Sequence, residues 1–381
     1  MKNLIALLLL LLASSVVSAQ VPDAAAREAL ASLPESQGVL FVNARRITNE
    51  ALPRVVPAAR LRAAFDDAKK QTTIDLREIE FVVVGARFDG DAARPNAPDF
   101  GVLIRGGFNA DAMLSFFRMG AQGKFREERR GAKTITIFQI DSDGEAKKGA
   151  APASPEASPS ASPKTDPFAL PTDLAAVSLD ANSVLVGTIP YVTSAVDARD
   201  GGGTRIKSEL VDLALRDTDA LVSLAATLPA SVSKYLDSGK GSPNMLVNDE
   251  MKRLLDSVRH AQASLNMTPA RFGFQTVLRA DTPEDARAIS GLVSVGVNSL
   301  TEELAKKSGG RKALRLTAGD RRMLELIRSL TNVVADRDVT LGVGVSQGTV
   351  AGFVSDMTGP PAKAPAKPVR RARAAGARRK A

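Results

Sequence analysis

His260 is the single histidine of this 381-residue chain, and the chain has no cysteine. Without cysteine, the chain can form neither a disulfide nor a thiolate that acts as nucleophile or soft metal ligand. A Ser-His-Asp triad needs its histidine beside a nucleophile in a cleft, and a histidine-based metal site normally has two or more histidines. We place His260 on a predicted helix, opposite its apolar stripe, and expect a solvated surface side chain.

Three short motifs combine serine, lysine and asparagine: Ser231-Val232-Ser233-Lys234, Ser264-Leu265-Asn266 and Lys307-Ser308-Gly309. In order and residue type they resemble the S-x-x-K, S-x-N and K-[ST]-G motifs of penicillin-binding serine enzymes. The resemblance implies that Ser231 is the acylated nucleophile and that Lys234 helps to deprotonate it. It also implies that Ser264 and Lys307 are accessory groups.

The spacing between these motifs departs from the enzyme family. Gaps of about thirty and forty residues are shorter than that fold requires. Lys307 ends a predicted helix instead of lying on a strand, and Leu265 belongs to an apolar helical stripe. A secreted serine hydrolase that uses Ser231 and Lys234 is therefore the alternative hypothesis. Helix-end and surface positions are the simpler interpretation of these residues.

Two polar segments have the composition of ion-binding or phosphate-binding loops. Asp141-Ser142-Asp143-Gly144-Glu145 begins like a calcium loop but lacks the third acidic position and the terminal glutamate. Asp200-Gly201-Gly202-Gly203-Thr204 lacks the lysine of a phosphate-binding loop. We interpret the first as the acidic entry to a linker and the second as a turn, and we predict neither a cofactor nor a metal.

The end of the chain is strongly basic. Eight basic residues and no acid follow Asp356, namely Lys363, Lys367, Arg370, Arg371, Arg373, Arg378, Arg379 and Lys380. Together with Lys2 they account for the whole formal net charge of +9, so residues 20 to 356 are formally neutral. Proline and alanine between these residues predict a disordered tail over 358–381. A tail of this composition is expected to be attracted to anionic envelope polymers, because each basic residue contributes about 1 kcal/mol of binding free energy near an anionic membrane. The alternative interpretation is an end of the chain that only keeps the protein soluble.

The first nineteen residues have the layout of a cleavable secretory signal. Lys2 precedes an apolar run from Leu4 to Leu12, and Val17-Ser18-Ala19 provides the small residues of a cleavage site. The apolar run is shorter than the ~20 residues that a spanning helix needs. We therefore expect residues 1–19 to be removed and the protein to be exported, to a periplasm or the extracellular medium.

The strands and helices that would position these groups occur in mixed order, which predicts an α+β fold with mainly antiparallel sheet. Apolar strands are predicted at 39–42 and 220–224. Strands at 100–105 and 272–279 each run into a helix, the first capped by Asn109 and the second by Thr282, with Pro283 in its first turn and Asp285 as the capping-box acid. Helical spacing of apolar residues predicts helices at 249–265 and from about 320 to 334.

The order of these elements recurs, with a hairpin at 176–189 matched to one at 339–354. We predict two related α+β units at 20–205, with a disordered insertion at 143–171, and at 206–357. This organisation resembles exported bacterial proteins of unknown function built from tandem α+β units, over most of residues 33 to 356.

The resemblance to these exported proteins of unknown function does not imply any particular activity. The chain has no Trp and only Tyr191 and Tyr235, which disfavours ligand sites that stack on aromatic rings. We therefore expect a non-catalytic envelope or extracellular protein, a binding or scaffold module localised by its tail.

Overall fold

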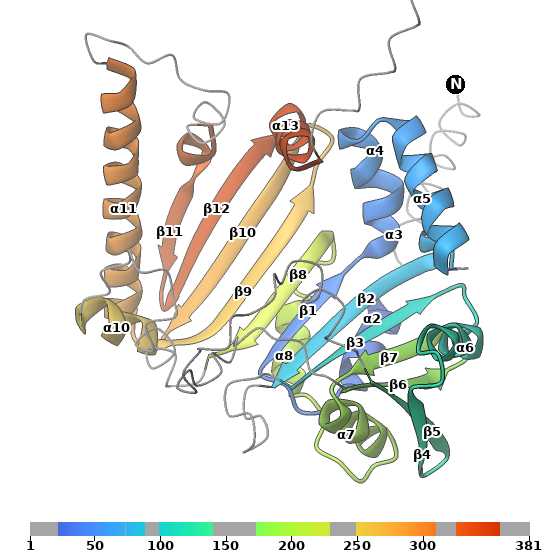
Figure 1. Cartoon of the computed structure of the whole chain (residues 1–381). Helices are drawn as coiled ribbons and strands as arrows, with labels where there is room; N and C mark the ends of the chain where they lie inside the picture. Colours follow the sequence, from blue (N-terminus) through green and yellow to red (C-terminus); the bar gives the residue numbers. More distant parts are fainter. Residues whose placement is uncertain are drawn as a thin grey trace, which may run out of the picture.

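The computed structural model describes residues 22–72, 74–87, 99–139, 173–228, 249–309 and 325–358 (Figure 1). The predicted insertion at 143–171 and the tail from Gly359 lie outside these residues. In chain order, the labelled elements are α2 (Pro22–Ala31), β1 (Gly38–Val42), α3 (Ala44–Arg46), the π-helical turn η1 (Ile47–Ala51), α4 (Leu52–Val55), α5 (Ala58–Thr72), η2 (Leu76–Glu78), β2 (Ile79–Arg87), β3 (Asp99–Gly106), α6 (Ala110–Gly120), β4 (Phe125–Arg130), β5 (Lys133–Gln139), β6 (Asp173–Asp180), β7 (Ser183–Gly187), α7 (Ile189–Arg199), α8 (Ser208–Ala214), β8 (Ala220–Thr227), α10 (Asp249–Asp256), β9 (Val258–Met267), β10 (Arg271–Ala280), α11 (Pro283–Gly309), β11 (Thr331–Ala335), β12 (Asp338–Ser346) and α13 (Gln347–Thr358).

All the labelled strands join one sheet of twelve strands in the order β11-β12-β10-β9-β8-β1-β2-β3-β7-β6-β5-β4. Each neighbouring pair is antiparallel, including the central pair β1 and β8. The predicted α+β class with mainly antiparallel sheet is confirmed. Among the described helices, none is both long and apolar enough to cross a membrane.

The two faces of the sheet differ in their cover. Residues paired across neighbouring strands lie on the same face. We call face A the side that carries Val39 and Ala225, and face B the side that carries Leu40 and Leu224. On face A, helices α2, α7 and α8 enclose the main core, in which Tyr191 is completely buried.

Face B is covered mainly towards its two ends. Helix α6 packs over β6 and β7, where Met113 and Leu114 meet Ala176 and Val184. Helix α11 packs over β10, β11 and β12 around Ile289. Figure 1 shows these two helices at opposite ends of the sheet.

A third apolar cluster on face B lies at one end of β8, β9 and β10, where Ala51 and Val350 pack near Val222, Leu265 and Phe272. The middle strands therefore lie between the α6 and α11 clusters, and this third cluster covers only one end of them.

The predicted helix caps are confirmed. The Asn109 side chain accepts a hydrogen bond from the backbone N–H of Ala112 at 2.9 Å, and α6 begins there. The Thr282 hydroxyl accepts one from the backbone N–H of Asp285 at 3.1 Å, ahead of Pro283 in α11. Both caps depend on residues within one helical turn, so local sequence was sufficient to predict them.

Three sequence predictions of secondary structure are wrong. The helix predicted at 249–265 ends at Asp256, and Val258–Met267 is strand β9, which pairs with both β8 and β10. The helix predicted to reach Val334 gives way to strand β11 at Thr331. The hairpin predicted at 339–354 is also different in the structure. The second hairpin is formed by β11 and β12 around Asp336, which has a positive φ of 52°. Residues 347–358 form helix α13 instead of a strand.

The strand order is alike on the two sides of the β1 and β8 pair. One side reads β1-β2-β3-β7-β6, with the β5 and β4 hairpin beyond it, and the other reads β8-β9-β10-β12-β11. In both sides a helix follows the third strand, α6 after β3 and α11 after β10. Helix α8, which lies in the predicted second unit, packs in the core of the first half.

Candidate functional site

An apolar row crosses the middle of face B. Strand pairing aligns its members directly, and they are Val186, Val102, Val84, Leu40, Leu224 and Ala263. Each is partly exposed, and Leu224 is 41% exposed. On face A of the same strands, Val39 is 1% exposed and Ala225 is completely buried. The apolar row is therefore in contact with solvent, although its strands form the centre of the sheet.

The sequence of the central strands fits a sheet that is covered on both faces. Strand β1 reads Gly-Val-Leu-Phe-Val and β2 contains Phe-Val-Val-Val, without the polar residues that a solvated face normally carries. Phe274 continues the apolar surface on β10 and is 48% exposed. This two-sided apolar pattern is the signal in the sequence that points to the surface.

Beside α6, face B is hollowed into an apolar pocket of about 560 Å³. We call this the α6 pocket, and its lining comprises Phe116, Phe117, Gly120, Ala121, Gln122, Lys124, Phe138, Gln139, Leu174 and Val186. The volume lies within the range of pockets that hold small ligands. Val186 belongs both to this pocket and to the apolar row, so the two surfaces are continuous.

The chemistry of the α6 pocket is that of binding. Among the described residues that line it, the polar groups are two glutamine amides and the Lys124 amine, with no carboxylate, hydroxyl or imidazole. A nucleophile with an adjacent base is therefore missing from that lining. The exposed side chains of Met119 and Phe125, in α6 and at the beginning of β4, add apolar surface in the same part of the fold.

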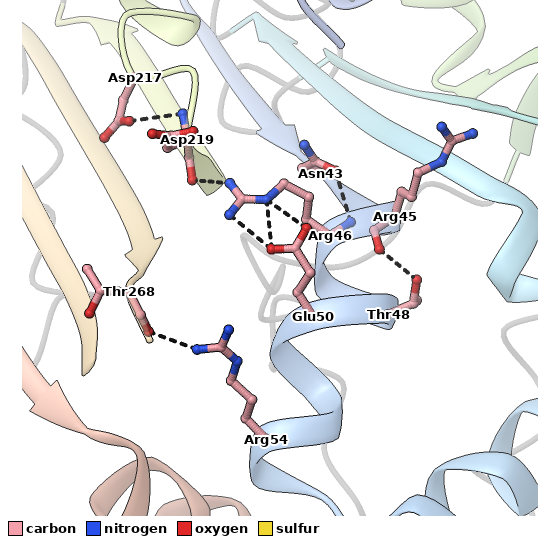
Figure 2. A network of polar contacts seen from close by, with 9 residues as sticks. All are labelled: Asn43, Arg45, Arg46, Thr48, Glu50, Arg54, Asp217, Asp219 and Thr268. Carbon is pink, nitrogen blue, oxygen red and sulfur yellow. Dashed lines mark hydrogen bonds and ion pairs between the residues drawn. The ribbon is translucent and has the colours of Figure 1, made fainter. Parts of the chain in front are cut away.

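A polar network joins the two halves of the sheet at one end (Figure 2). Arg46 forms an ion pair with Glu50 at 3.1 Å and donates a hydrogen bond to the backbone carbonyl of Asp219. Arg54 donates to the backbone carbonyl of Thr268 at 2.9 Å. The Asn43 side chain accepts from the backbone N–H of Arg46, so it caps α3. The network connects the helices after β1 to the beginning of β8 and to the β9–β10 turn. It therefore holds these helices in place against the second half of the sheet.

The structure separates the accessory groups of the serine hydrolase hypothesis. Ser264 lies on face A, where its hydroxyl donates to Asp217 at 3.2 Å and Asn266 donates to the same carboxylate at 2.5 Å. Lys307 lies in α11, which packs on face B. Ser231 and Lys234 lie outside the described residues. The sheet therefore does not bring Ser264 and Lys307 together.

His260 has surroundings different from those predicted. It lies on strand β9 instead of a helix, and its side chain is 24% exposed. Its Nε2 atom is 3.7 Å from Glu209 Oε1, while its Nδ1 atom is buried without a hydrogen bond. In the described part of the chain, no group of three or more His, Asp or Glu side chains is placed to hold a metal ion.

The fold and the site together define a class of protein, an α+β protein with a continuous antiparallel sheet and an open apolar face. No family model and no curated protein matches the chain. Among solved structures, crystal form III of TP0453, a bacterial protein of unknown function, has a TM-score of 0.41 and 9% identity, covering 86% of this chain and 97% of that chain. Crystal form IV has a TM-score of 0.39 and 9% identity, covering 87% and 99%. This likeness is weak and carries no function to the present chain.

Proposed function

We propose that this chain is a non-catalytic, exported protein of the cell envelope or extracellular space that binds the apolar part of an envelope amphiphile on face B. The observation that carries this proposal is the partly exposed apolar row and its continuity with the α6 pocket. Burying apolar surface contributes about 25 cal/mol per Å², so a ligand that covers this row gains affinity without needing directed polar contacts.

The basic tail has a separate role in the proposal. The eight basic residues from Lys363 to Lys380 tether the protein to anionic envelope polymers. Because such attraction is screened by salt, the tail supplies the salt-sensitive part of binding and face B supplies the rest. The signal at residues 1–19 delivers the protein across the cytoplasmic membrane.

The proposal includes an internal duplication. The similar strand order on the two sides of the β1 and β8 pair supports two related units, with α6 and α11 as equivalent helices. The hairpin that follows each of these helices then corresponds as β6–β7 to β11–β12, and the β4–β5 hairpin is an addition to the first unit. Both related helices cover face B, which leaves the apolar row between them.

The test is co-sedimentation of the mature protein with isolated cell envelopes across a salt series. Deleting residues 358–381 is expected to remove the binding that fades as salt is raised. Changing Leu224→Gln and Phe274→Gln together is expected to lower the binding that persists in high salt by roughly tenfold or more, since two apolar side chains lose their burial.

The matched control is Val333→Gln. Val333 is 56% exposed, which is comparable to Phe274, but it lies on face A of the edge strand β11. Its substitution is expected to leave both components of binding unchanged. Equal losses in the control and in the face B variant would reject face B as the recognition surface, and unchanged salt dependence after tail deletion would reject the tether.

A further inference from the structure

Three arginines from separate parts of the chain line one pocket of about 240 Å³ on face A. Arg105 lies on β3, Arg199 is the last residue of α7, and Arg205 lies between α7 and α8. Helix α2 closes the pocket with Ala29 and Ser32. We call this the arginine pocket. It lies on the opposite side of the sheet from the apolar row, so its chemistry is independent of that surface.

These arginines lack the partners that other arginines of the fold possess. Within the described residues, none of the three side chains has a carboxylate oxygen within 4.0 Å, and only the Arg205 side chain donates a hydrogen bond, to the backbone carbonyl of Ala198 at 2.9 Å. By contrast, Arg27 on α2 is paired with Asp212 at 2.5 Å. Arg105 is also partly buried, whereas Arg199 and Arg205 are exposed.

Ser183 provides a second, independent observation. It lies directly opposite Arg105 in the pairing of β3 with β7, and it lines the same pocket. The residue is only 2% exposed, and in the described part of the chain its hydroxyl has no hydrogen-bond partner. Because Ser183 lines the pocket, this hydroxyl is free to donate a hydrogen bond to a ligand that enters it.

A ligand that satisfies these groups must bring several oxygen acceptors and negative charge. The planar fork of a guanidinium matches phosphate oxygens in pairs, and a serine hydroxyl can donate to a third. Glu28 and Asp180 also line the pocket, and Asp180 already accepts a hydrogen bond from the backbone N–H of Asn182 at 2.9 Å. These carboxylates can accept hydrogen bonds from hydroxyl groups next to the phosphate, and they disfavour a bare polyanion.

We propose that the arginine pocket binds a phosphate ester of a small hydroxyl-bearing unit, of which glycerol phosphate is the simplest. Arg105 and Ser183 hold the phosphate oxygens from the floor of the pocket, on the sheet, and Arg199 and Arg205 approach from its rim. Glu28 and Asp180 accept from the hydroxyl groups. The inference extends the proposed affinity for anionic envelope polymers and names the unit that the folded body recognises.

The test is isothermal titration calorimetry with the full chain at constant ionic strength, using glycerol phosphate, inorganic phosphate and glycerol as probes. Glycerol phosphate is expected to bind at one site, more tightly than inorganic phosphate, and glycerol is expected not to bind. Arg105→Gln is expected to weaken glycerol phosphate binding at least tenfold, because charge-assisted hydrogen bonds are lost. Arg199→Gln changes an exposed residue and keeps the test valid if the Arg105 variant fails to fold.

The matched control is Arg27→Gln, which removes one positive charge from α2 outside the pocket. It is expected to leave the affinity unchanged, whereas an equal loss in this variant would show that only general electrostatic attraction is measured. Absence of saturable binding by either phosphate probe would overturn the site. Equal affinity for inorganic phosphate and glycerol phosphate would overturn the role of Glu28 and Asp180. Every variant keeps the tail, so these results do not depend on whether the tail binds envelopes.

Discussion

Tyr191 is completely buried, and its surroundings explain how a phenol is accommodated in an apolar core. Its hydroxyl forms a hydrogen bond with Ser36 at 2.7 Å, and the Arg87 guanidinium lies 5.8 Å from its ring centroid. Burial raises the pKa of Tyr191 to about 12, although the hydrogen bond with Ser36 and the charge of Arg87 both act to lower it. The neutral phenol is therefore strongly preferred in the folded state.

This shift predicts a loss of stability at alkaline pH. The pKa of a tyrosine in the unfolded chain is about 10, so the stabilisation is fully present below that pH and is lost as pH rises towards 12. Tyr191→Phe removes the titrating group, and its free energy of unfolding is expected to fall less between pH 9 and pH 11 than that of the wild type. At pH 7 the variant is expected to be about 1 kcal/mol less stable, because the hydrogen bond to Ser36 is lost.

Urea unfolding at the two pH values measures both effects. Ser36→Ala is the control, since it removes the same hydrogen bond and keeps the phenol, so it is expected to retain the alkaline loss. Parallel pH profiles for the wild type and Tyr191→Phe would show that another group causes the loss.

At the scale of elements, glycines in β2 and β3 allow α7 to pack closely on face A. A Cβ atom at Gly85 would overlap the Tyr191 hydroxyl, and one at Gly101 would overlap its ring. Helix α7 therefore rests on a part of the sheet that has no side chains. Gly38, at the beginning of β1, has no neighbouring atom within 4 Å of the Cβ position.

Gly85→Ala is expected to destabilise the protein by about 1 to 3 kcal/mol, as overpacking of a core commonly does. Gly38→Ala is expected to change the free energy of unfolding by less than about 0.5 kcal/mol, because its new methyl group meets open space. Thermal and urea unfolding of the two variants provide the comparison. Combining Gly85→Ala with Tyr191→Phe should recover part of the loss, and failure to do so would show that the overlap is relieved in another way.

Strand β9 shows why some elements could not be predicted from the sequence. Val258, Ala261 and Leu265 have helical spacing, but the same segment alternates between apolar residues on face B and polar residues such as Gln262 on face A. Two neighbouring strands, β8 and β10, decide between the two periods by supplying hydrogen bonds on both sides. Local sequence does not contain that information, whereas the caps at Asn109 and Thr282 are local and were predicted.

The candidate sites depend even more on tertiary structure. The apolar row draws its residues from six different strands, and the arginine pocket combines Arg105 with Arg199 and Arg205. These arginines have no spacing that marks them as a group in the sequence. The basic tail differs from these sites, because its amino-acid composition alone is the basis of the hypothesis that it binds anionic polymers. The sequence was therefore informative about class and charge, and uninformative about which side chains the sheet would assemble.

At the scale of the whole molecule, the central pair β1 and β8 joins the two halves. Its five residue pairs run from Gly38 with Ala226 to Val42 with Val222. Helix α8 lies just beyond the predicted boundary at residue 205, yet it packs with α2 in the core of the first half. Separating the chain at residue 205 would expose an edge of β8 and remove part of that core.

We therefore expect a fragment of residues 206–381 to lack cooperative unfolding by itself, because an exposed apolar edge strand favours association. Mixed with a fragment of residues 20–205, it is expected to recover a cooperative transition through the β1 and β8 pair. Circular dichroism during urea unfolding, with size-exclusion chromatography, measures both outcomes. A fragment of residues 206–381 that unfolds cooperatively alone would show that the two units are independent domains.

The place where α13 ends determines how a tethered molecule would be oriented. Helix α13 packs against α4 through Val350, and Gln347 donates a hydrogen bond to the Pro269 carbonyl in the β9–β10 turn, at the same end of the sheet as Arg54. The chain passes Thr358 and enters the tail from this end (Figure 1). Attachment through the tail would therefore bring this end of the sheet nearer to the anionic surface than the opposite end. Both faces would then remain accessible from the side, to ligands that diffuse along the surface.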